Sequence, residues 1–264
     1  MNLIVLIPIY KEKPDSDEIL SLQQCFKVLA FYDICLVCPE SLDTTIYNNI
    51  VKKEIKTERF ASTFFAGIAG YNELMTSMQF YNRFKKYDYM LIYQLDAWVF
   101  SDELEEWCRK GYDYIGAPWF EQHKTHEEGY GFWCCGNGGL SLRKISTFIR
   151  VTNPKTRLMT LKEIANKYFR HLKTWRKGIE LLLYKNNMKW YRKKNSHLWE
   201  DTYFCYGLDE TKHKLHRPSP EEAARFSFEC SPEYLFQFIG RTLPFGCHAW
   251  RKFQYEEFWS KYIH

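Results

Sequence analysis

The run from Tyr89 to Phe100 is apolar and rich in aromatic side chains, and it contains a single carboxylate, Asp96. Its composition predicts a buried strand. Aspartate is depleted in strands and costly to bury unless it is paired or binds a metal. At the end of a central strand, Asp96 is where an α/β protein would hold a cation and a phosphorylated ligand. The alternative is an aspartate that only ends the strand and caps the next segment.

Apolar segments alternate with helical patterns through the first half of the chain. Strands are expected at residues 3–8, 34–38, within 57–65, at 90–100 and at 112–116, and helices at 16–29, 70–84 and 102–108. This order is typical of βαβ units and predicts a Rossmann-like α/β fold, a mostly parallel sheet flanked by helices. Right-handed crossovers would place a ligand crevice at the carboxyl ends of the strands.

The composition indicates a soluble globular protein. With 264 residues, 26% charged residues and no apolar stretch close to the roughly 18 residues that span a bilayer, we expect one domain over residues 1–264. The start, Met1 to Pro8, has no basic region or cleavage site and predicts a strand, not a signal peptide. Nine scattered cysteines favour reduced thiols. We therefore expect a cytoplasmic protein.

Positive charge is concentrated in one segment. Between Lys167 and Lys194 there are ten Lys or Arg residues and one acid, within a helical pattern that predicts a basic insertion at about 161–195. Apolar residues recur there at helical spacing, among them Leu172, Trp175, Ile179, Leu182 and Leu183. This pattern favours peripheral contact with an anionic membrane, with Trp190 and Tyr191 near the interface. The alternative is a solvated helix packed on the core. Nucleic-acid binding is not expected, because no base-reading motif is present.

Two clusters, one before and one after Asp96 in the sequence, could lie close to it. Pro8, Tyr10 and Lys11 follow the first strand, where an aromatic ring can stack on a base and a lysine can contact a phosphate. A plain turn with a surface lysine is the alternative. The run from Gly136 to Arg143 has three glycines that permit positive φ or close backbone approach to a ligand. A tight hairpin is the alternative there.

Two further candidates lie later in the chain. Glu200 and Asp201 are adjacent acids in an apolar, aromatic context, and they either cap a helix or act as a general base with its neighbour. His248 lies in a turn near the carboxyl end. An imidazole with a carboxylate can bind Mn²⁺ or Mg²⁺, although a buried structural histidine is also common.

Together these segments resemble a known family. The stretches Tyr93–Ala97, Asp113–Trp119, Gly136–Arg143, Glu200–Asp201 and Phe245–His248 are similar to a group of bacterial glycosyltransferase-like proteins with a GT-A fold, associated with surface-polysaccharide synthesis. The resemblance covers roughly residues 3 to 260, except the basic helical segment. It implies a GT-A-like domain that transfers a sugar from a nucleotide donor.

The resemblance also implies roles for individual residues. The usual Asp-x-Asp is Gln94-Leu95-Asp96 here, so Gln94 would contact the ribose, and Asp96 with His248 would hold Mn²⁺ or Mg²⁺. Asp201 would be the base of an inverting reaction, with Glu200 beside it. The remaining donor contacts implied are Pro8, Tyr10 and Lys11 at the nucleotide, Tyr71 and Asn72 near the base, and Asn137, Gly138 and Gly139 at the donor sugar.

The expected partners follow from this resemblance. The donor would be UDP-linked, and the acceptor a glycan or lipid-linked oligosaccharide at the inner face of the cytoplasmic membrane. Two alternatives remain open: a metal-dependent nucleotidyltransferase and a non-catalytic protein that binds nucleotides or glycans. The nucleotidyltransferase is disfavoured because no glycine-rich basic loop follows the first strand.

Overall fold

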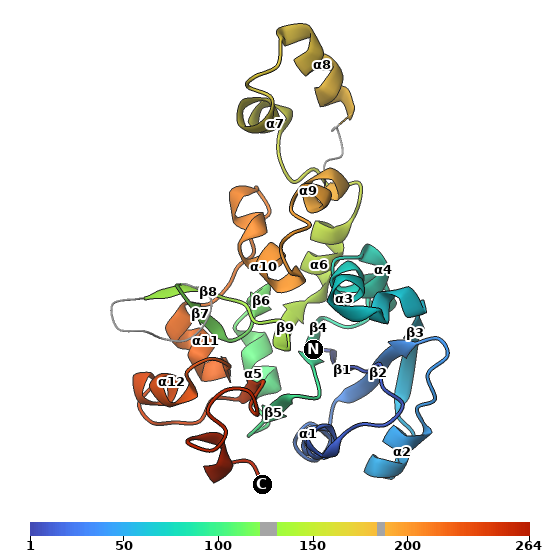
Figure 1. Ribbon diagram of the computed structural model, residues 1–264, viewed down its shortest axis with the longest axis vertical. Helices are drawn as coiled ribbons and strands as arrows, with labels where there is room; N and C mark the ends of the chain where they lie inside the picture. The colour runs from blue at the N-terminus through green and yellow to red at the C-terminus, as the bar shows by residue number, and fades with distance from the viewer. Residues whose placement is uncertain (122–130, 184–187) are drawn as a thin grey trace.

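A computed structural model describes residues 1–121, 131–183 and 188–264 (Figure 1). Its centre is a six-stranded sheet with the strand order β3-β2-β1-β4-β9-β6. The strands are β1 (Leu3–Pro8), β2 (Asp33–Pro39), β3 (Lys56–Phe60), β4 (Tyr89–Tyr93), β6 (Tyr114–Ile115) and β9 (Leu140–Lys144). The first four are parallel, whereas β9 runs antiparallel between β4 and β6. The predicted mostly parallel sheet is confirmed.

Both faces of the sheet are covered by helices. Along β1, Val5 and Ile7 belong to one hydrophobic core, and Ile4 and Leu6 to the other, as alternation along a strand requires. The first core includes residues of α1 (Ser16–Val28), α2 (Thr45–Val51) and α5 (Leu104–Arg109). The second includes residues of α3 (Gly67–Met75), α4 (Met78–Arg83), α6 (Ile145–Thr152) and α10 (Glu200–Cys205). Strands buried on both faces explain the continuous apolar runs in the sequence.

Two smaller sheets flank the central one. The order β10-β11-β5 unites β10 (Ser227–Phe228), β11 (Gly246–His248) and β5 (Ala97–Val99), and β7 (Pro118–Phe120) pairs with β8 (Phe132–Cys135). Their core also includes residues of α11 (Pro220–Phe226) and α12 (Pro232–Phe238). All nine cysteines are free, in agreement with the expectation of reduced thiols.

The prediction of a single strand at residues 90–100 is wrong. The chain forms β4, turns at Gln94–Asp96 and continues as β5 in a different sheet. The turn is closed by the Ala97 N–H, which donates to the Gln94 carbonyl at 2.8 Å. Both strands are buried and apolar, so hydrophobicity alone could not separate them.

The helix predicted at residues 70–84 is also divided. It begins earlier, at Gly67, and breaks between α3 and α4, where the Thr76 hydroxyl donates to the Asn72 carbonyl at 2.6 Å. Ser77 then caps α4, its hydroxyl accepting the Phe80 N–H at 3.2 Å. Hydroxyl groups that bond to nearby backbone favour such helix ends.

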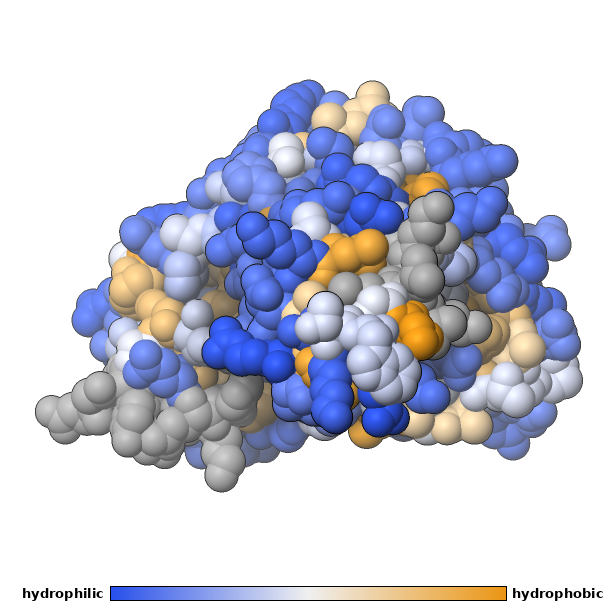
Figure 2. Space-filling model, turned by 90° about the horizontal axis from the view of Figure 1, so that it is seen from above, coloured by the Kyte–Doolittle hydropathy of each residue, from blue (hydrophilic) through white to orange (hydrophobic). Residues whose placement is uncertain are grey.

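The basic segment forms three separate helices. We call α7 (Leu161–Tyr168) and α8 (Thr174–Leu183) the arm, because they project from one end of the body (Figure 1). The chain returns through α9 (Met188–Lys194). Figure 2 looks onto this end, which is mainly hydrophilic with small hydrophobic areas. Residues 184–187 of the predicted insertion lie outside the described residues.

The expectation that Tyr191 lies at a membrane interface is wrong, whereas the expectation for the half-buried Trp190 stays a prediction. Tyr191 is buried and its hydroxyl donates to the Gly207 carbonyl, while Trp190 packs edge-on against Tyr168. Tyr191 therefore joins α9 to the body, and Trp190 joins it to α7 of the arm. Among the residues of this segment whose burial the structure describes, Trp175 and Ile179 on α8 are the exposed large apolar ones, at 67% and 55%.

In the described parts of the chain, no helix combines the length and the hydrophobicity that crossing a membrane requires.

Candidate functional site

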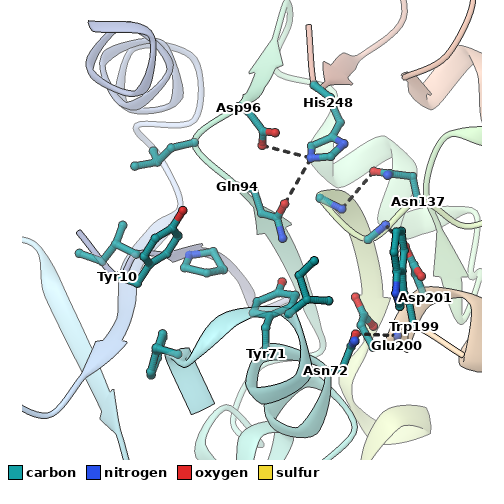
Figure 3. Close-up of a pocket in the computed structure, with 18 of the residues that line it drawn as sticks. Tyr10, Tyr71, Asn72, Gln94, Asp96, Asn137, Trp199, Glu200, Asp201 and His248 are labelled. Atoms are coloured by element: carbon teal, nitrogen blue, oxygen red, sulfur yellow. Dashed lines mark hydrogen bonds and ion pairs between the residues drawn. The ribbon is translucent and has the colours of Figure 1, made fainter. Parts of the chain in front are cut away.

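A cleft of about 620 Å³ opens at the carboxyl ends of β1 and β4 (Figure 3). This is the edge where the alternating pattern predicted a ligand, and the volume suits a small molecule. Every residue that the sequence singled out lines it: Pro8, Tyr10, Lys11, Tyr71, Asn72, Gln94, Asp96, Asn137, Gly138, Gly139, Glu200, Asp201 and His248. Their proximity is a structural fact, whereas their roles stay predictions.

Asp96 and His248 meet in the cleft, where the Asp96 side chain is 55% exposed and that of His248 is 11% exposed. The His248 Nε2 lies 3.1 Å from Asp96 Oδ1 and 3.2 Å from Gln94 Oε1. The antiparallel pairing of β11 with β5 brings these residues together, since His248 is the register partner of Ala97. A strand near the carboxyl end of the chain thus completes a site begun by the turn after β4.

The surroundings of Asp96 and His248 favour a positive charge at the imidazole or next to it. Burial alone would lower the pKa of His248, but the carboxylates of Asp96 and Glu229 outweigh it and raise that pKa to about 10. For Asp96, burial opposes ionisation, yet the adjacent imidazole lowers the pKa of the carboxyl below its usual value. Either a proton or a metal ion could supply the positive charge.

The donor set fits a hard divalent cation. Two neighbouring ligands of an octahedral Mg²⁺ lie about 3 Å apart, close to the 3.1 Å between Nε2 and Oδ1. Carboxylate, amide and imidazole groups are all suitable ligands, and substrate phosphates commonly complete such a shell. Among the described residues no group of three or more His, Cys, Asp or Glu could bind a metal alone. A cation held by Asp96 and His248 would take its remaining ligands from a bound substrate and water.

Glu229 was not recognised from the sequence. Its Oε1 accepts a hydrogen bond from Asn137 Nδ2 at 2.7 Å and lies 3.1 Å from His248 Nδ1. Phe228 pairs with Cys247 in the parallel β10–β11 ladder, so the next residues, Glu229 and His248, are neighbours. A two-residue strand gives no detectable periodicity, and no signal in the sequence pointed to this carboxylate.

The glycine run serves close packing. A Cβ on Gly139 would come within 2.0 Å of His248 Nε2, and one on Gly138 within 2.5 Å of Glu200 Oε1. The Gly139 carbonyl accepts the Gln94 N–H at 2.9 Å, which holds this loop against the turn. The tight hairpin that was the alternative for this run does not form, because β8 pairs with β7 whereas β9 pairs with β4 and β6.

The two adjacent acids have different surroundings. Glu200 is 2% exposed and its Oε1 accepts a hydrogen bond from Arg143 Nη2 at 2.8 Å, whereas its Oε2 has no partner among the described residues. Asp201 Oδ2 accepts the Gly138 N–H at 3.2 Å. Burial, and then the charge of Glu200, raises the pKa of Asp201 to about 7. Asp201 is thus suited to exchange a proton near neutral pH.

The opposite side of the cleft carries Tyr10, which is 64% exposed and lies across from Asn137, Trp199 and Asp201 (Figure 3). Lys11 is engaged by Glu18 at 2.8 Å and by Asp15 at 3.3 Å. Lys252, which the sequence did not single out, also lines the cleft, and no ion pair involves it within the described part of the chain. It adds a second cation on the Asp96 side, where its charge helps to lower the pKa of Asp96.

A family model of proteins of unknown function, DUF5672, matches residues 54–248, which is more than half of the chain. The chain belongs to this family. The matched region includes the turn after β4, the glycine run, Glu200–Asp201, Glu229 and His248. No curated protein sequence matches the chain.

Solved structures of glycosyltransferases align with this chain. Mouse xyloside xylosyltransferase 1, in its apo form, aligns with a TM-score of 0.53 at 11% identity, over 94% of this chain and 97% of that one. Streptococcus pneumoniae TIGR4 glycosyltransferase GlyE gives 0.49 at 12% identity, over 99% of this chain and 60% of GlyE. Galactosyltransferase LgtC, solved with donor and acceptor sugar analogues, gives 0.45 at 11% identity, over 93% and 86%.

The alignment with the xylosyltransferase supports the fold assignment. This protein has the mixed α/β fold of GT-A glycosyltransferases, as the resemblance of its motifs predicted. At such identity the likeness concerns the fold, and function has to be argued from the site.

Proposed function

We propose that this protein is a nucleotide-sugar-dependent glycosyltransferase and that residues 1–264 form one GT-A-like catalytic domain with an inserted arm. One observation carries the proposal: the Asp96–His248 pair shares a cleft with Asp201, a carboxylate whose pKa is raised to about 7. A cation site beside a neutral-pH base suits the transfer of a group from a diphosphate.

The donor would lie across the cleft. The nucleoside would contact Pro8, Tyr10, Tyr71 and Asn72, and its ribose would contact Gln94. Uridine is the nucleoside that we propose. A divalent cation held by Asp96 and His248 would neutralise the diphosphate leaving group. Lys252 would assist it, and Lys11 could do so only by exchanging its present contacts with Glu18 and Asp15. Asn137, Gly138 and Gly139 would adjoin the donor sugar.

Asp201 would act as the base of an inverting reaction. The acceptor hydroxyl oxygen would bond to the anomeric carbon as the bond from that carbon to the diphosphate oxygen breaks. The diphosphate would leave with the electron pair, and the hydroxyl proton would pass to Asp201. Glu200, held by Arg143, would orient groups beside it, since it lines the cleft next to Asp201.

The acceptor we propose is a glycan or lipid-linked oligosaccharide of surface-polysaccharide synthesis, reached at the inner face of the cytoplasmic membrane. The arm supports a contact with the membrane, because Trp175 and Ile179 are exposed there among basic residues.

The test is a panel of nucleotide sugars with and without Mn²⁺, measured as protein-dependent release of nucleoside diphosphate. We expect release from at least one UDP-sugar, and its loss in Asp96→Ala. The matched control is Asp102→Ala, an exposed acid in the loop after β5 that hydrogen-bonds to Tyr32. Nucleotide binding without any release would favour the binding-protein alternative, and pyrophosphate formation from a nucleoside triphosphate and a sugar phosphate would favour a nucleotidyltransferase.

A further inference from the structure

Glu229 connects the two halves of the cleft through its hydrogen bonds. One carboxylate oxygen, Oε1, lies within hydrogen-bonding distance of both His248 Nδ1 and Asn137 Nδ2, at 3.1 and 2.7 Å. The other, Oε2, accepts from Trp119 Nε1 at 3.4 Å. The side chain is only 13% exposed, so these contacts are little screened by water.

The contact with His248 determines which ring nitrogen faces Asp96. A carboxylate at Nδ1 favours a proton on that nitrogen, which leaves the lone pair of a neutral imidazole on Nε2. Nε2 is the atom that lies 3.1 Å from Asp96 Oδ1. A carboxylate behind a metal-binding histidine is the common means of fixing the ring and raising its basicity.

Through its contact with Asn137, Glu229 is also linked by hydrogen bonds to the glycine run. Asn137 Oδ1 accepts the Gly139 N–H at 3.0 Å, and the Gly139 carbonyl accepts the Gln94 N–H at 2.9 Å. Because the His248 Nε2 is also 3.2 Å from Gln94 Oε1, these contacts form a closed ring of five residues. Any movement of Glu229 would therefore change the position of both the imidazole and the loop.

We infer that Glu229 is a positioning residue, which orients His248 for a divalent cation and couples that site to the Asn137–Gly139 loop. This inference rests on the proposed function and assigns it a residue outside the catalytic and cation-binding groups. Glu229 acts through His248 and Asn137, whereas Asp96 and His248 supply the ligands.

The test is Mn²⁺ affinity, measured by electron paramagnetic resonance titration of the full chain in saturating UDP. Loss of such a partner typically weakens metal binding 10- to 100-fold, and we expect this of Glu229→Gln. Glu229→Asp, which keeps the charge but withdraws the oxygen, should also weaken binding and serves if the glutamine variant does not fold. Imidazole ¹⁴N coupling to Mn²⁺ should decrease in the same variants.

Glu222→Gln is the matched control. Glu222 also accepts two side-chain hydrogen bonds, from Lys110 and Tyr112 at 2.7 Å each, but it does not line the cleft. It should bind Mn²⁺ as the wild type does. A folded Glu229 variant with unchanged Mn²⁺ affinity would overturn the positioning role of Glu229 and leave the proposed function unaffected. A wild type that binds no Mn²⁺ with UDP would remove the cation site, and with it both this inference and the metal part of the proposed function.

Discussion

Asp201 has a carboxyl group that titrates near neutrality, because burial and the neighbouring Glu200 both disfavour its charge. If it is the base, kcat/KM should rise with pH through about pH 7, since only the ionised form accepts a proton. Asp201→Asn should lose about 10²- to 10⁴-fold in turnover and still bind the donor. Near-normal sugar transfer by this variant would refute the assignment and favour a retaining mechanism.

The same carboxyl group should make stability depend on pH. Its pKa is about 7 in the folded protein against an ordinary 3.8, so the folded state holds the proton more strongly. The stabilisation is present at low pH and is lost as pH rises through 7. Asp201→Asn should therefore melt at a higher temperature than the wild type at pH 8, by a margin that shrinks towards pH 5. A constant difference across this range would contradict the raised pKa.

Gly139 has no room for a side chain. A Cβ there would meet His248 Nε2 at 2.0 Å, so Gly139→Ala must displace the imidazole or the loop. A misplacement of about 1 Å can cost roughly 10²-fold in rate, and we expect a loss of that order in turnover. Gly178→Ala is the control and should be fully active, because a Cβ there would meet no described atom within 4 Å apart from its own helix backbone and chain neighbours. Equal activity of the two variants would show that His248 is not required.

Among the elements, the arm carries the membrane proposal. Trp175 and Ile179 are exposed one turn apart on α8, and Arg176 lies between them in sequence. The full chain should float with anionic liposomes, and salt should weaken this binding. Trp175→Ala should reduce flotation, whereas Phe31→Ala should not, although Phe31 is 94% exposed, because it lies between α1 and β2. Equal binding to neutral and anionic vesicles would rule out the proposed contact.

Some elements could be read from the sequence because one physical signal dominated them. β1 is apolar throughout and β2 is apolar from Ile34 onward, as burial on both faces requires, and Pro8 and Pro39 mark their ends. The division of residues 89–100 into β4 and β5 could not be read, because it depends on pairing with β11 nearly 150 residues later. Glu229 could not be predicted as a site residue for the same reason, because only the β10–β11 register places it beside His248.

At the scale of the whole molecule, a buried ion pair joins the central sheet to the helix that carries Asp201. Arg143 of β9 is fully buried and contacts Glu200 of α10, Tyr81 of α4 and Ser141. Removing one partner leaves the other charge uncompensated, which typically costs about 3–5 kcal/mol. Arg143→Met should therefore lower the free energy of unfolding by that amount in urea denaturation.

Lys56→Met is the comparison for this prediction. The Lys56–Asp33 pair is exposed and should contribute less than about 1 kcal/mol. Glu200→Gln should resemble Arg143→Met in stability, so its activity is informative only after folding has been verified. Similar small effects for the buried and exposed pairs would contradict the importance of the Arg143–Glu200 contact.

The base of the arm has a consequence for engineering. The Met188 N–H donates to the Thr156 carbonyl at 3.3 Å, so the chain comes back to the place from which it departed. No strand of the sheets and no residue that lines the cleft lies between these two residues in the described part of the chain, although Leu158, Met159 and Ile164 pack into the second hydrophobic core. The tip of the arm, at residues 169–173, is accordingly a place to graft a fluorophore or an affinity tag. Replacing the tip with a different binding sequence would direct the protein to a different partner, and the cleft would still bind the same donor.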